Sequence, residues 1–431
     1  MRWRPRRPPG RLATAVVTFV VTLLGVLVFT NFFAGEKKID QKVERLYGTS
    51  DPQFVRSMGV LLGAQFREGN RFTTLENGDE IFPEMLTAIR GARKTITFET
   101  YIYWSGDIGQ AFADALGERA RSGVRVHVLL DWIGSSKMDK KLLDEMKQAG
   151  VEIRRYHEPK WWNLPRLNNR THRKLLVVDG AVGFTGGVGI ADKWTGHAQD
   201  PDHWRDTHVK AEGPVVGQMQ AVFMDNWTKA TGKVLHGADY FPALPAVGDS
   251  PAQVFSSSPS GGSESMHLMY LLAITAAERT IHLSSSYFVP DELALNALVA
   301  ALKRGVKVQI ITPGPIIDTE IVRKASRSKW GDLLGAGAEI YEYQPTMFHC
   351  KVMVVDSLLV SVGSTNFDNR SFRLNDEANL NVYDAAYAQH EVDVFRADLA
   401  KSRRVTLAEW NDRPYTDRLM EAMISLIDEQ L

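Results

Sequence analysis

The sequence predicts an α/β protein built from two similar halves, and three observations lead to this fold class. Strand-like and helix-like segments alternate along most of the chain, which is typical of a mainly parallel sheet covered by helices on both faces. One pattern of residues occurs twice, at 171–187 and at 349–366. The segments before each copy also correspond in order, so we expect a duplicated unit.

The chain opens with an apolar segment. Five arginines lie among the first eleven residues, and the uncharged run 12–33 follows them. As a helix this run would be about 33 Å long, enough to cross a bilayer. We expect a transmembrane anchor within residues 1–35 rather than a cleaved signal peptide, because the run is long and Phe32-Phe33-Ala34 is a poor cleavage site. The charge bias favours a cytoplasmic N terminus, a single pass of the cell membrane and an extracytoplasmic body.

The rest of the chain divides into four predicted parts. Residues 36–77 are expected to form a connector, and 78–241 the first repeat. A stretch rich in Pro, Ser and Gly, 242–263, is interpreted as a linker before the second repeat and its C-terminal helices at 264–431. In the repeats, strands at 94–103 and 279–288 correspond, helices at 108–122 and 293–304 correspond, and a further strand begins at Gly123 or Gly305.

Each copy of the repeated pattern reads His-x-Lys-x4-Asp, followed after six residues by Gly-Gly or Gly-Ser. The two-residue period of a strand puts His and Lys on one face. An imidazole beside an ammonium suits a phosphoryl group, because Lys holds the oxygens while His attacks or transfers a proton. One such pair is typical of an ordinary surface strand, but two copies at the same spacing predict a site that acts on a phosphoryl group. The candidate catalytic residues are His172, Lys174, Asp179, His349, Lys351 and Asp356.

The chemistry that these residues predict needs no metal ion and no other cofactor. One neutral imidazole would attack phosphorus and form a phosphohistidine, while the other, protonated, would serve the leaving alkoxide. Two lysines would supply fixed positive charge where phosphate charge grows. The single cysteine excludes an internal disulfide framework and a cysteine-rich zinc site, and the histidines and aspartates at 197–208 match no zinc spacing.

The paired motifs resemble those of the phospholipase D superfamily, and the sequence from residue 77 to the C terminus resembles bacterial cardiolipin synthases. The resemblance implies two phospholipase D-like halves packed about a pseudo-two-fold axis, with the active site at their interface. It implies that His172 is the nucleophile and His349 the acid and base, although the residues alone leave these roles open. We interpret Asp179 and Asp356, at strand ends, as mainly structural members of the signature.

Further site residues follow from the same resemblance. Asp206 and Glu377 occupy corresponding places in the two halves and match the carboxylates that orient the histidines in the family. Ser364 and Asn366 match residues that bind the phosphate. The first repeat departs from the pattern, because Gly189 stands where the family has Asn, and Asn168 or Asn169 could substitute for it.

Aromatic residues near the motifs have two interpretations each. Those after the first strand of each half either flank the cleft or pack in the core: Tyr101, Tyr103, Tyr287 and Phe288. Trp161 and Trp162, just before the first motif, are expected to enter the bilayer interface, with plain packing as the alternative.

The resemblance implies a phosphatidyltransferase that joins two phosphatidylglycerol molecules through a phosphohistidine and releases glycerol. The alternatives are a phospholipase D that forms phosphatidic acid, a nuclease of the same superfamily, and a non-catalytic membrane protein. Without the five N-terminal arginines the body has 46 basic against 51 acidic residues. Such a charge argues against nucleic acid as a partner, because a nuclease needs a basic surface. The sequence makes no prediction of the oligomeric state.

Overall fold

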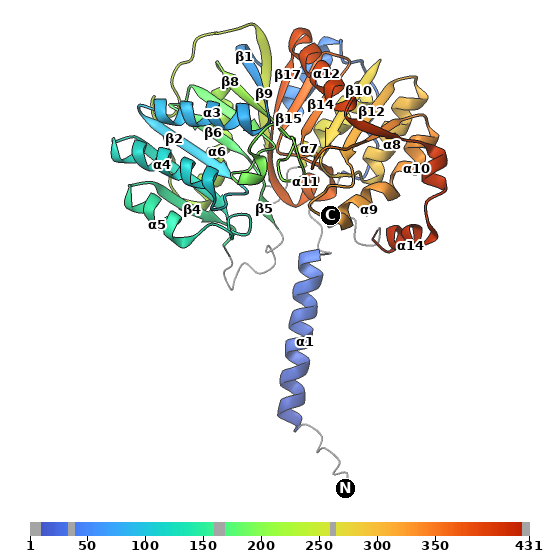
Figure 1. The fold of residues 1–431 in the computed structure, drawn as a ribbon, viewed down its shortest axis with the longest axis horizontal. Coiled ribbons are helices and arrows are strands. Elements are labelled where there is room, and N and C mark those ends of the chain that lie inside the picture. The colour runs from blue at the N-terminus through green and yellow to red at the C-terminus, as the bar shows by residue number, and fades with distance from the viewer. Residues whose placement is uncertain (1–9, 33–38, 159–168, 259–263, 425–431) are drawn as a thin grey trace.

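The body of the protein is one long β-sheet with helices on both faces, as the computed structural model shows (Figure 1). The structure describes residues 10–32, 39–158, 169–258 and 264–424, so Trp161, Trp162 and Asn168 lie outside the described residues. The two halves of the sheet repeat the same order of elements. This confirms the predicted α/β class and the predicted duplication.

The N-terminal helix, α1 (Arg11–Phe32), extends away from the body in Figure 1. Its described side chains are mostly apolar and exposed, among them Leu12 at 81% and Phe19 at 67% exposure. Within the described part of the chain, no helix combines the length and the apolar character needed to cross a membrane. The helix expected at residues 12–33 is therefore present over residues 12–32, whereas the prediction that it spans a bilayer is not confirmed.

The first half of the body starts with two elements in the predicted connector, α2 (Pro52–Leu61) and β1 (Arg67–Glu76). The alternating strands and helices expected of the first repeat follow. They are α3 (Asn77–Gly91), β2 (Thr95–Thr100), α4 (Asp107–Arg121), β3 (Arg125–Asp131), α5 (Lys140–Gln148), β4 (Glu152–Tyr156), β5 (Arg170–Thr171), β6 (Leu175–Val178), β7 (Val182–Gly186), a 3-10 turn (Asp192–Trp194), β8 (Thr207–Glu212) and α6 (Val216–Thr231).

The second half repeats this order and adds elements at its end. It starts with β9 (Ser250–Ser257), α7 (Ser265–Ala276), β10 (Thr280–Ser285), β11 (Phe288–Val289), α8 (Glu292–Lys303), β12 (Lys307–Pro313), α9 (Glu320–Ser328), α10 (Trp330–Gly335) and β13 (Glu339–Tyr343). It continues with β14 (Lys351–Val355), β15 (Leu359–Gly363), β16 (Phe367–Asp368), α11 (Asn369–Arg373), β17 (Asn375–Tyr383), α12 (Ala385–Leu399), β18 (Ser402–Val405), α13 (Leu407–Asn411) and α14 (Tyr415–Ile424).

The strands of the main sheet run in the order β18-β13-β12-β10-β14-β15-β17-β9-β1-β8-β7-β6-β2-β3-β4 from edge to edge. Along this path only β2-β3-β4 and β10-β12-β13 are parallel, and every other neighbouring pair is antiparallel. The prediction of a mainly parallel sheet is therefore wrong, because the sheet is mixed. Apart from the edge strand β18, the order is symmetric about the β9-β1 pair, as a duplication requires.

Tight turns after the motif strands explain why β6 pairs with β7, and β14 with β15, in antiparallel fashion. β6 and β7 are joined by residues 179–181, and β14 and β15 by residues 356–358. Asp179 and Asp356 have left-handed φ angles of 52° and 55°, a conformation that Asp tolerates better than most residues. A turn this short returns the chain beside the strand it has just left, so the pair must be antiparallel.

β1 and β9 join the two halves. Arg67 pairs with Ala252 and Asn70 with Ser250, while β1 also pairs with β8 and β9 with β17. The predicted connector, 36–77, and the predicted linker, 242–263, thus each contribute a central strand to the sheet. Pro, Ser and Gly around β9 indicate a loop, but burial of Ala252 and Val254 against the core fixes a strand there.

An apolar cluster at the centre of the sheet takes side chains from both halves. Leu175 and Val209 of the first half and Val254, Val360 and Leu380 of the second are at most 2% exposed. Helices α6 and α12 cover this face, and α3, α4, α7 and α8 cover the other. Burying each such side chain contributes about 1.5–3 kcal/mol, so this cluster holds the two halves in fixed register.

Candidate active site

The first motif lies where β5 leads into β6. His172 and Lys174 precede β6, and the backbone N–H of His172 donates to the carbonyl of Asp376 over 2.9 Å. β5 pairs in parallel with the start of β17, which belongs to the second half. The first histidine is therefore held in place by the other half of the molecule.

The second motif is positioned in the same way with the halves exchanged. His349 lies two residues before the start of the motif strand β14. Its backbone N–H donates to the carbonyl of Arg205 over 2.7 Å, next to a bridge between Arg205 and Phe348. The two motif segments thus cross into opposite halves, and both histidines lie at the interface.

Each histidine pairs with a carboxylate of the opposite half. Nδ1 of His172 lies 3.0 Å from Oε1 of Glu377, and Nδ1 of His349 lies 2.7 Å from Oδ2 of Asp206. Both carboxylates are fully buried, and the histidines are 8% and 6% exposed. Because an ionised carboxylate only accepts hydrogen bonds, the neutral rings carry their proton on Nδ1, which leaves a lone pair on Nε2.

The two motif lysines lie beside their histidines. Nζ of Lys174 donates to the carbonyl of His172, and Nζ of Lys351 to that of His349, each over 2.8 Å. Lys351 also donates to Oγ of Ser286 over 2.7 Å and lies 3.3 Å from Nε2 of His349. Each lysine also lowers the pKa of the histidine in the other motif. The four side chains therefore interact electrostatically as one site.

Burial keeps the histidines neutral. It lowers the pKa of His172 to about 4, while Glu377 opposes this effect and Lys174 adds to it. Burial, and then the charge of Lys351, lower the pKa of His349, whereas the charge and hydrogen bond of Asp206 raise it. At neutral pH the site therefore presents neutral imidazoles that carry their lone pair on Nε2.

The carboxylates stay ionised in spite of their burial. Burial pushes the pKa of Asp206 up, but the charge and hydrogen bond of His349 hold it below its usual value. Glu377 behaves likewise, because His172 offsets the effect of burial and the carboxyl pKa is lowered. Each carboxylate can thus stabilise the imidazolium that forms when its histidine takes up a proton.

Burial also makes the two lysines easier to deprotonate. Burial, and then repulsion by Lys351, lower the pKa of Lys174 to about 7. The pKa of Lys351 is lowered by burial as well. A phosphate anion between the two ammonium groups would reverse both effects, because an opposite charge favours the protonated form. The site therefore matches an anionic ligand.

The glycine-serine segments after the motifs differ between the halves. Oγ of Ser364 donates to Glu377, and Oδ1 of Asn366 accepts from Ser286, which in turn accepts from Lys351. Ser364 thus holds a carboxylate in this structure, and its expected contact with phosphate stays a prediction. At Gly189, the counterpart of Asn366, a Cβ would lie 2.8 Å from Cβ of Ile102, so the packing leaves no room for Asn there.

The motif aspartates lie away from the histidines, at the far ends of β6 and β14. Asp179 accepts from the backbone N–H groups of residues 93, 94 and 95 over 2.7–2.9 Å. Asp356 accepts from the backbone N–H groups of residues 278, 279 and 280 over 2.7–2.8 Å, and from Oγ1 of Thr49. These bonds fix the start of β2 and β10. This placement agrees with the structural interpretation of both residues.

Aromatic side chains surround both histidines. Tyr101 lies 5.1 Å from His172 and Tyr287 lies 6.5 Å from His349 between ring centroids, whereas Tyr103 and Phe288 pack in the core. Trp194 and Trp204, whose rings lie 5.2 and 5.6 Å from His349, are not indicated by any pattern in the sequence. Ser286 could have been found, because it ends the serine run that aligns with the first repeat.

Comparisons with known proteins agree with this geometry. A family model described as a cardiolipin synthase, PLD-like domain, matches residues 85–227 and 270–399, one segment in each half. The chain is 35% identical over 367 residues to the major cardiolipin synthase ClsA of Bacillus subtilis (strain 168), which covers 84% of this chain and 76% of that protein. It is 37% identical over 363 residues to a cardiolipin synthase of Geobacillus kaustophilus (strain HTA426), with 83% and 72% covered.

A solved structure resembles the fold. The phosphatidylserine synthase of Haemophilus influenzae Rd KW20 superposes with a TM-score of 0.67 at 13% identity, over 88% of this chain and 100% of that one. At this identity the likeness concerns the fold alone. Because the family model matches both halves, and relatives above 30% identity align over most of their length, the chain belongs to the cardiolipin synthase family of PLD-like proteins.

Proposed function

We propose that this protein makes cardiolipin by transferring a phosphatidyl group from one phosphatidylglycerol molecule to a second, with release of glycerol. The observation that carries the proposal is the buried pair of histidines, each hydrogen-bonded to a carboxylate of the opposite half. Two imidazoles whose lone pairs lie on Nε2, beside two lysines, suit the double displacement that such a transfer requires.

In the first step, Nε2 of His172 attacks the phosphorus of a bound phosphatidylglycerol. The bond from phosphorus to the glycerol headgroup breaks, and His349, protonated in the presence of the anion, gives its proton to the leaving oxygen. Asp206 stabilises the protonated His349, and Glu377 fixes the ring of His172. The product of this step is a phosphatidyl group on His172 and free glycerol.

In the second step, the glycerol hydroxyl of another phosphatidylglycerol replaces the first. His349, now neutral, accepts the hydroxyl proton as the oxygen attacks phosphorus, and the bond from phosphorus to Nε2 of His172 breaks. Lys174 and Lys351 hold the non-bridging oxygens in both steps, and this takes the place of a metal ion. Both histidines return to their starting protonation states.

We also propose that α1 anchors the body to the cell membrane as a single-pass helix, with the N terminus in the cytoplasm and the body outside. The uncharged run 12–33 and the exposed apolar side chains of α1 support this proposal. Protease added to intact cells should digest the body. Protection of the body until the cells are lysed would contradict this orientation.

The reaction is tested with purified full-length protein in phosphatidylglycerol vesicles, by separating the lipid products. We expect cardiolipin and one glycerol for each cardiolipin formed. Phosphatidic acid in place of cardiolipin would show that water is the acceptor and would make the protein a phospholipase D. A protein carrying His349→Ala should form neither product, which separates an enzyme from a membrane-bound scaffold.

A further inference from the structure

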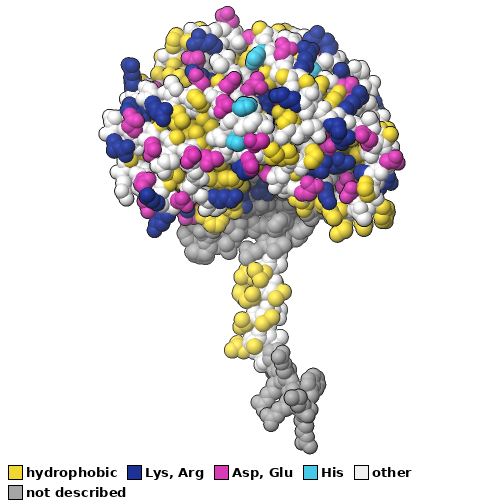
Figure 2. Space-filling view, viewed as in Figure 1, with side chains coloured by type: hydrophobic (Ala, Val, Ile, Leu, Met, Phe, Trp, Pro, Cys, Tyr) yellow, Lys and Arg dark blue, Asp and Glu magenta, His cyan; other side chains and the backbone are white. Residues whose placement is uncertain are grey.

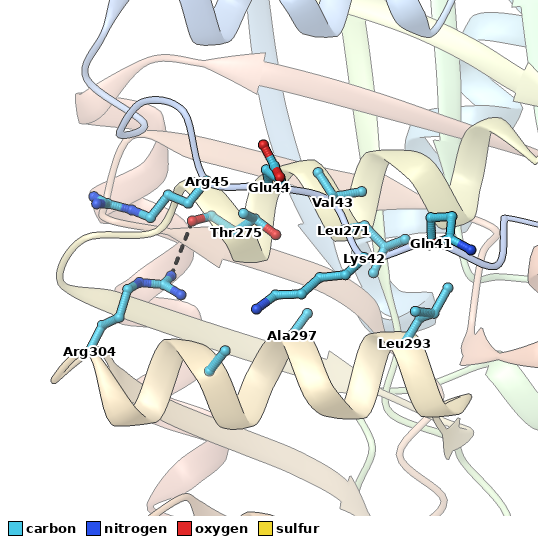
Figure 3. A pocket seen from close by; sticks show the side chains of 11 residues that line it. Gln41, Lys42, Val43, Glu44, Arg45, Leu271, Thr275, Leu293, Ala297 and Arg304 are labelled. Atoms are coloured by element: carbon cyan, nitrogen blue, oxygen red, sulfur yellow. Dashed lines mark hydrogen bonds between the residues drawn. The ribbon is translucent and has the colours of Figure 1, made fainter.

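A cavity of about 610 Å³ lies apart from the histidines, between the segment that follows α1 and the helices α7 and α8 (Figure 3). Residues 41–45 form one wall. Leu271 and Thr275 of α7 and Leu293 and Ala297 of α8 form the other. None of the side chains that line this cavity belongs to the proposed mechanism. We call it the basic cavity, after the three cations described next.

The lining of the basic cavity has an excess of positive charge. Lys42, Arg45 and Arg304 face a single acid, Glu44. Lys42 makes no hydrogen bond or ion pair with any residue that the structure describes, and in Figure 3 its side chain extends into the space between α8 and the 41–45 segment. The carboxylate of Glu44 points away from that ammonium group in the same view. Arg45 forms an ion pair with Glu278, outside the lining, over 3.7 Å.

The charges of Arg45 and Arg304 repel each other. Arg304 is tied to the end of α7, where its guanidinium donates to the carbonyls of Ile274, Thr275 and Ala277 over 3.1–3.3 Å. Burial, and then the charge of Arg45, lower the pKa of Arg304. Two like charges held together in this way are stabilised when an anion binds between them.

The wall that α7 and α8 contribute is mainly apolar. Leu293 and Ala297 are partly buried where they line the cavity, and Leu271 lies behind them at 2% exposure. A free phosphate ion would gain nothing from such a wall, whereas an amphiphile would cover it and remove its apolar surface from water, which is favourable. The cavity thus combines a phosphate-binding side with a side that suits a lipid.

The cavity also lies close to the proposed anchor. Eight residues separate Phe32, the end of α1, from Gln41, so the two are at most about 30 Å apart along an extended chain. We propose that the basic cavity binds the headgroup of an anionic phospholipid, with its phosphate between Lys42, Arg45 and Arg304 and its acyl ends along Leu293 and Ala297.

Such a site gives the body a second attachment to lipid, beside the segment that connects it to α1. The same helix that lines the cavity also touches the active site region, because the hydroxyl of Tyr270 on α7 donates to the carbonyl of Thr365 over 3.3 Å. A bound lipid therefore contacts a helix that packs directly on the Ser364–Asn366 segment. This inference goes beyond the transfer reaction, since it concerns a lipid that is held and not converted.

The test uses the full chain with His349→Ala, which stops turnover, in micelles of an uncharged detergent. A fluorophore that responds to polarity is attached to Gln41→Cys, and Cys350, the other cysteine, is buried. The probes are dihexanoyl phosphatidylglycerol, dihexanoyl phosphatidylcholine and inorganic phosphate. We expect half-saturation at a concentration at least about tenfold lower with phosphatidylglycerol than with phosphatidylcholine, and no response to phosphate at the same concentration.

A charge variant and a matched control locate the response. Lys42→Gln with Arg45→Gln should raise the half-saturating concentration of phosphatidylglycerol at least about tenfold. Lys303→Gln, an exposed lysine of α8 outside the lining, should leave it unchanged. Equal responses to the two lipids, an equal response to phosphate, or no effect of the charge variant would each overturn the proposal. Transfer activity is measured separately on the chain with His349 intact, so a failure of this site is distinct from a failure of the proposed reaction.

Discussion

The two halves of the molecule share one backbone frame but support their histidines differently. Glu377, beside His172, receives hydrogen bonds from Ser364 and from the side chain of Asn375. Asp206, beside His349, receives them from the indole of Trp194 and from the backbone N–H of Thr207. Duplication thus preserved the geometry of the pair, while the surroundings of each histidine diverged enough for different chemical roles.

The difference continues at the residues after the motif strands. A Cβ on Gly187, the counterpart of Ser364, would lie 2.1 Å from Oδ1 of Asp206. The first half therefore makes room for its carboxylate by having no side chain at residue 187. The second half has a hydroxyl at the corresponding position, which donates a hydrogen bond to the carboxylate. Symmetry at the level of strands does not extend to the side chains that hold the carboxylates.

Removing either histidine should have the largest effect and should separate the two roles. We expect His172→Ala and His349→Ala each to lower the rate of cardiolipin formation by at least about 10⁴-fold. With lipid labelled at phosphorus, rapid quenching should trap the label on His172 in the His349→Ala protein. Label on His349 in the His172→Ala protein would reverse the assignment.

Neutralising either carboxylate should shift the pH profile of the transfer reaction, on a different limb for each variant. Glu377→Gln and Asp206→Asn should each lower kcat by about 10²–10⁴-fold. His172 must be neutral, and the loss of Glu377 lowers its pKa, so the acid limb of the pH profile should move to lower pH. His349 must be protonated, and the loss of Asp206 lowers its pKa, so in that variant the alkaline limb should move to lower pH. Identical shifts in both variants would mean that the two histidines are interchangeable.

Substituting Ala for the small residue next to each carboxylate should lower kcat by intermediate and unequal amounts. Gly187→Ala should lower kcat by about 10²-fold, because the new Cβ displaces Asp206 from His349. Ser364→Ala should lower it only about tenfold, because Glu377 loses one hydrogen bond but keeps its place. Steady-state kinetics on the two variants would check this order, and equal losses would argue that both positions act through packing alone.

The motif aspartates should affect stability more than catalysis. Asp356→Ala should lower the free energy of unfolding by about 2–4 kcal/mol, because it leaves three backbone N–H groups and Thr49 without their acceptor. Asp179→Ala should cost about 1–3 kcal/mol, since Asp179 is less buried and, among the described residues, accepts hydrogen bonds from backbone N–H groups but from no side chain. Denaturant unfolding measures both values, and a larger loss from Asp179→Ala would contradict the comparison.

Much of the fold could be predicted from the sequence, because it follows from local patterns. The helices at 108–122 and 293–304 are found within one residue, as α4 and α8. The antiparallel hairpins were missed because the pattern after Asp179 and Asp356 shows a turn but not the direction of the next strand. β1 and β9 were missed because their partners lie in other parts of the chain, which local composition does not reveal.

The site was predictable in its members but not in its pairing. His172, His349, Asp206 and Glu377 do converge, as expected. That each carboxylate serves the histidine of the opposite half depends on how the halves pack, and no spacing in the sequence contains this information. Trp194 was missed for a similar reason, since its indole reaches Asp206 only after the chain between β7 and β8 has folded over His349.

The crossing of the carboxylates between halves has a consequence for the synthesis of the protein. The ribosome releases His172 long before residue 377, so the imidazole at the first motif has no carboxylate partner while the second half is still being made. His349, in turn, meets Asp206 only once both halves are present. A chain already attached to lipid through its N terminus would therefore stay chemically inert until translation is nearly complete, and an interrupted chain could not attack the lipids around it.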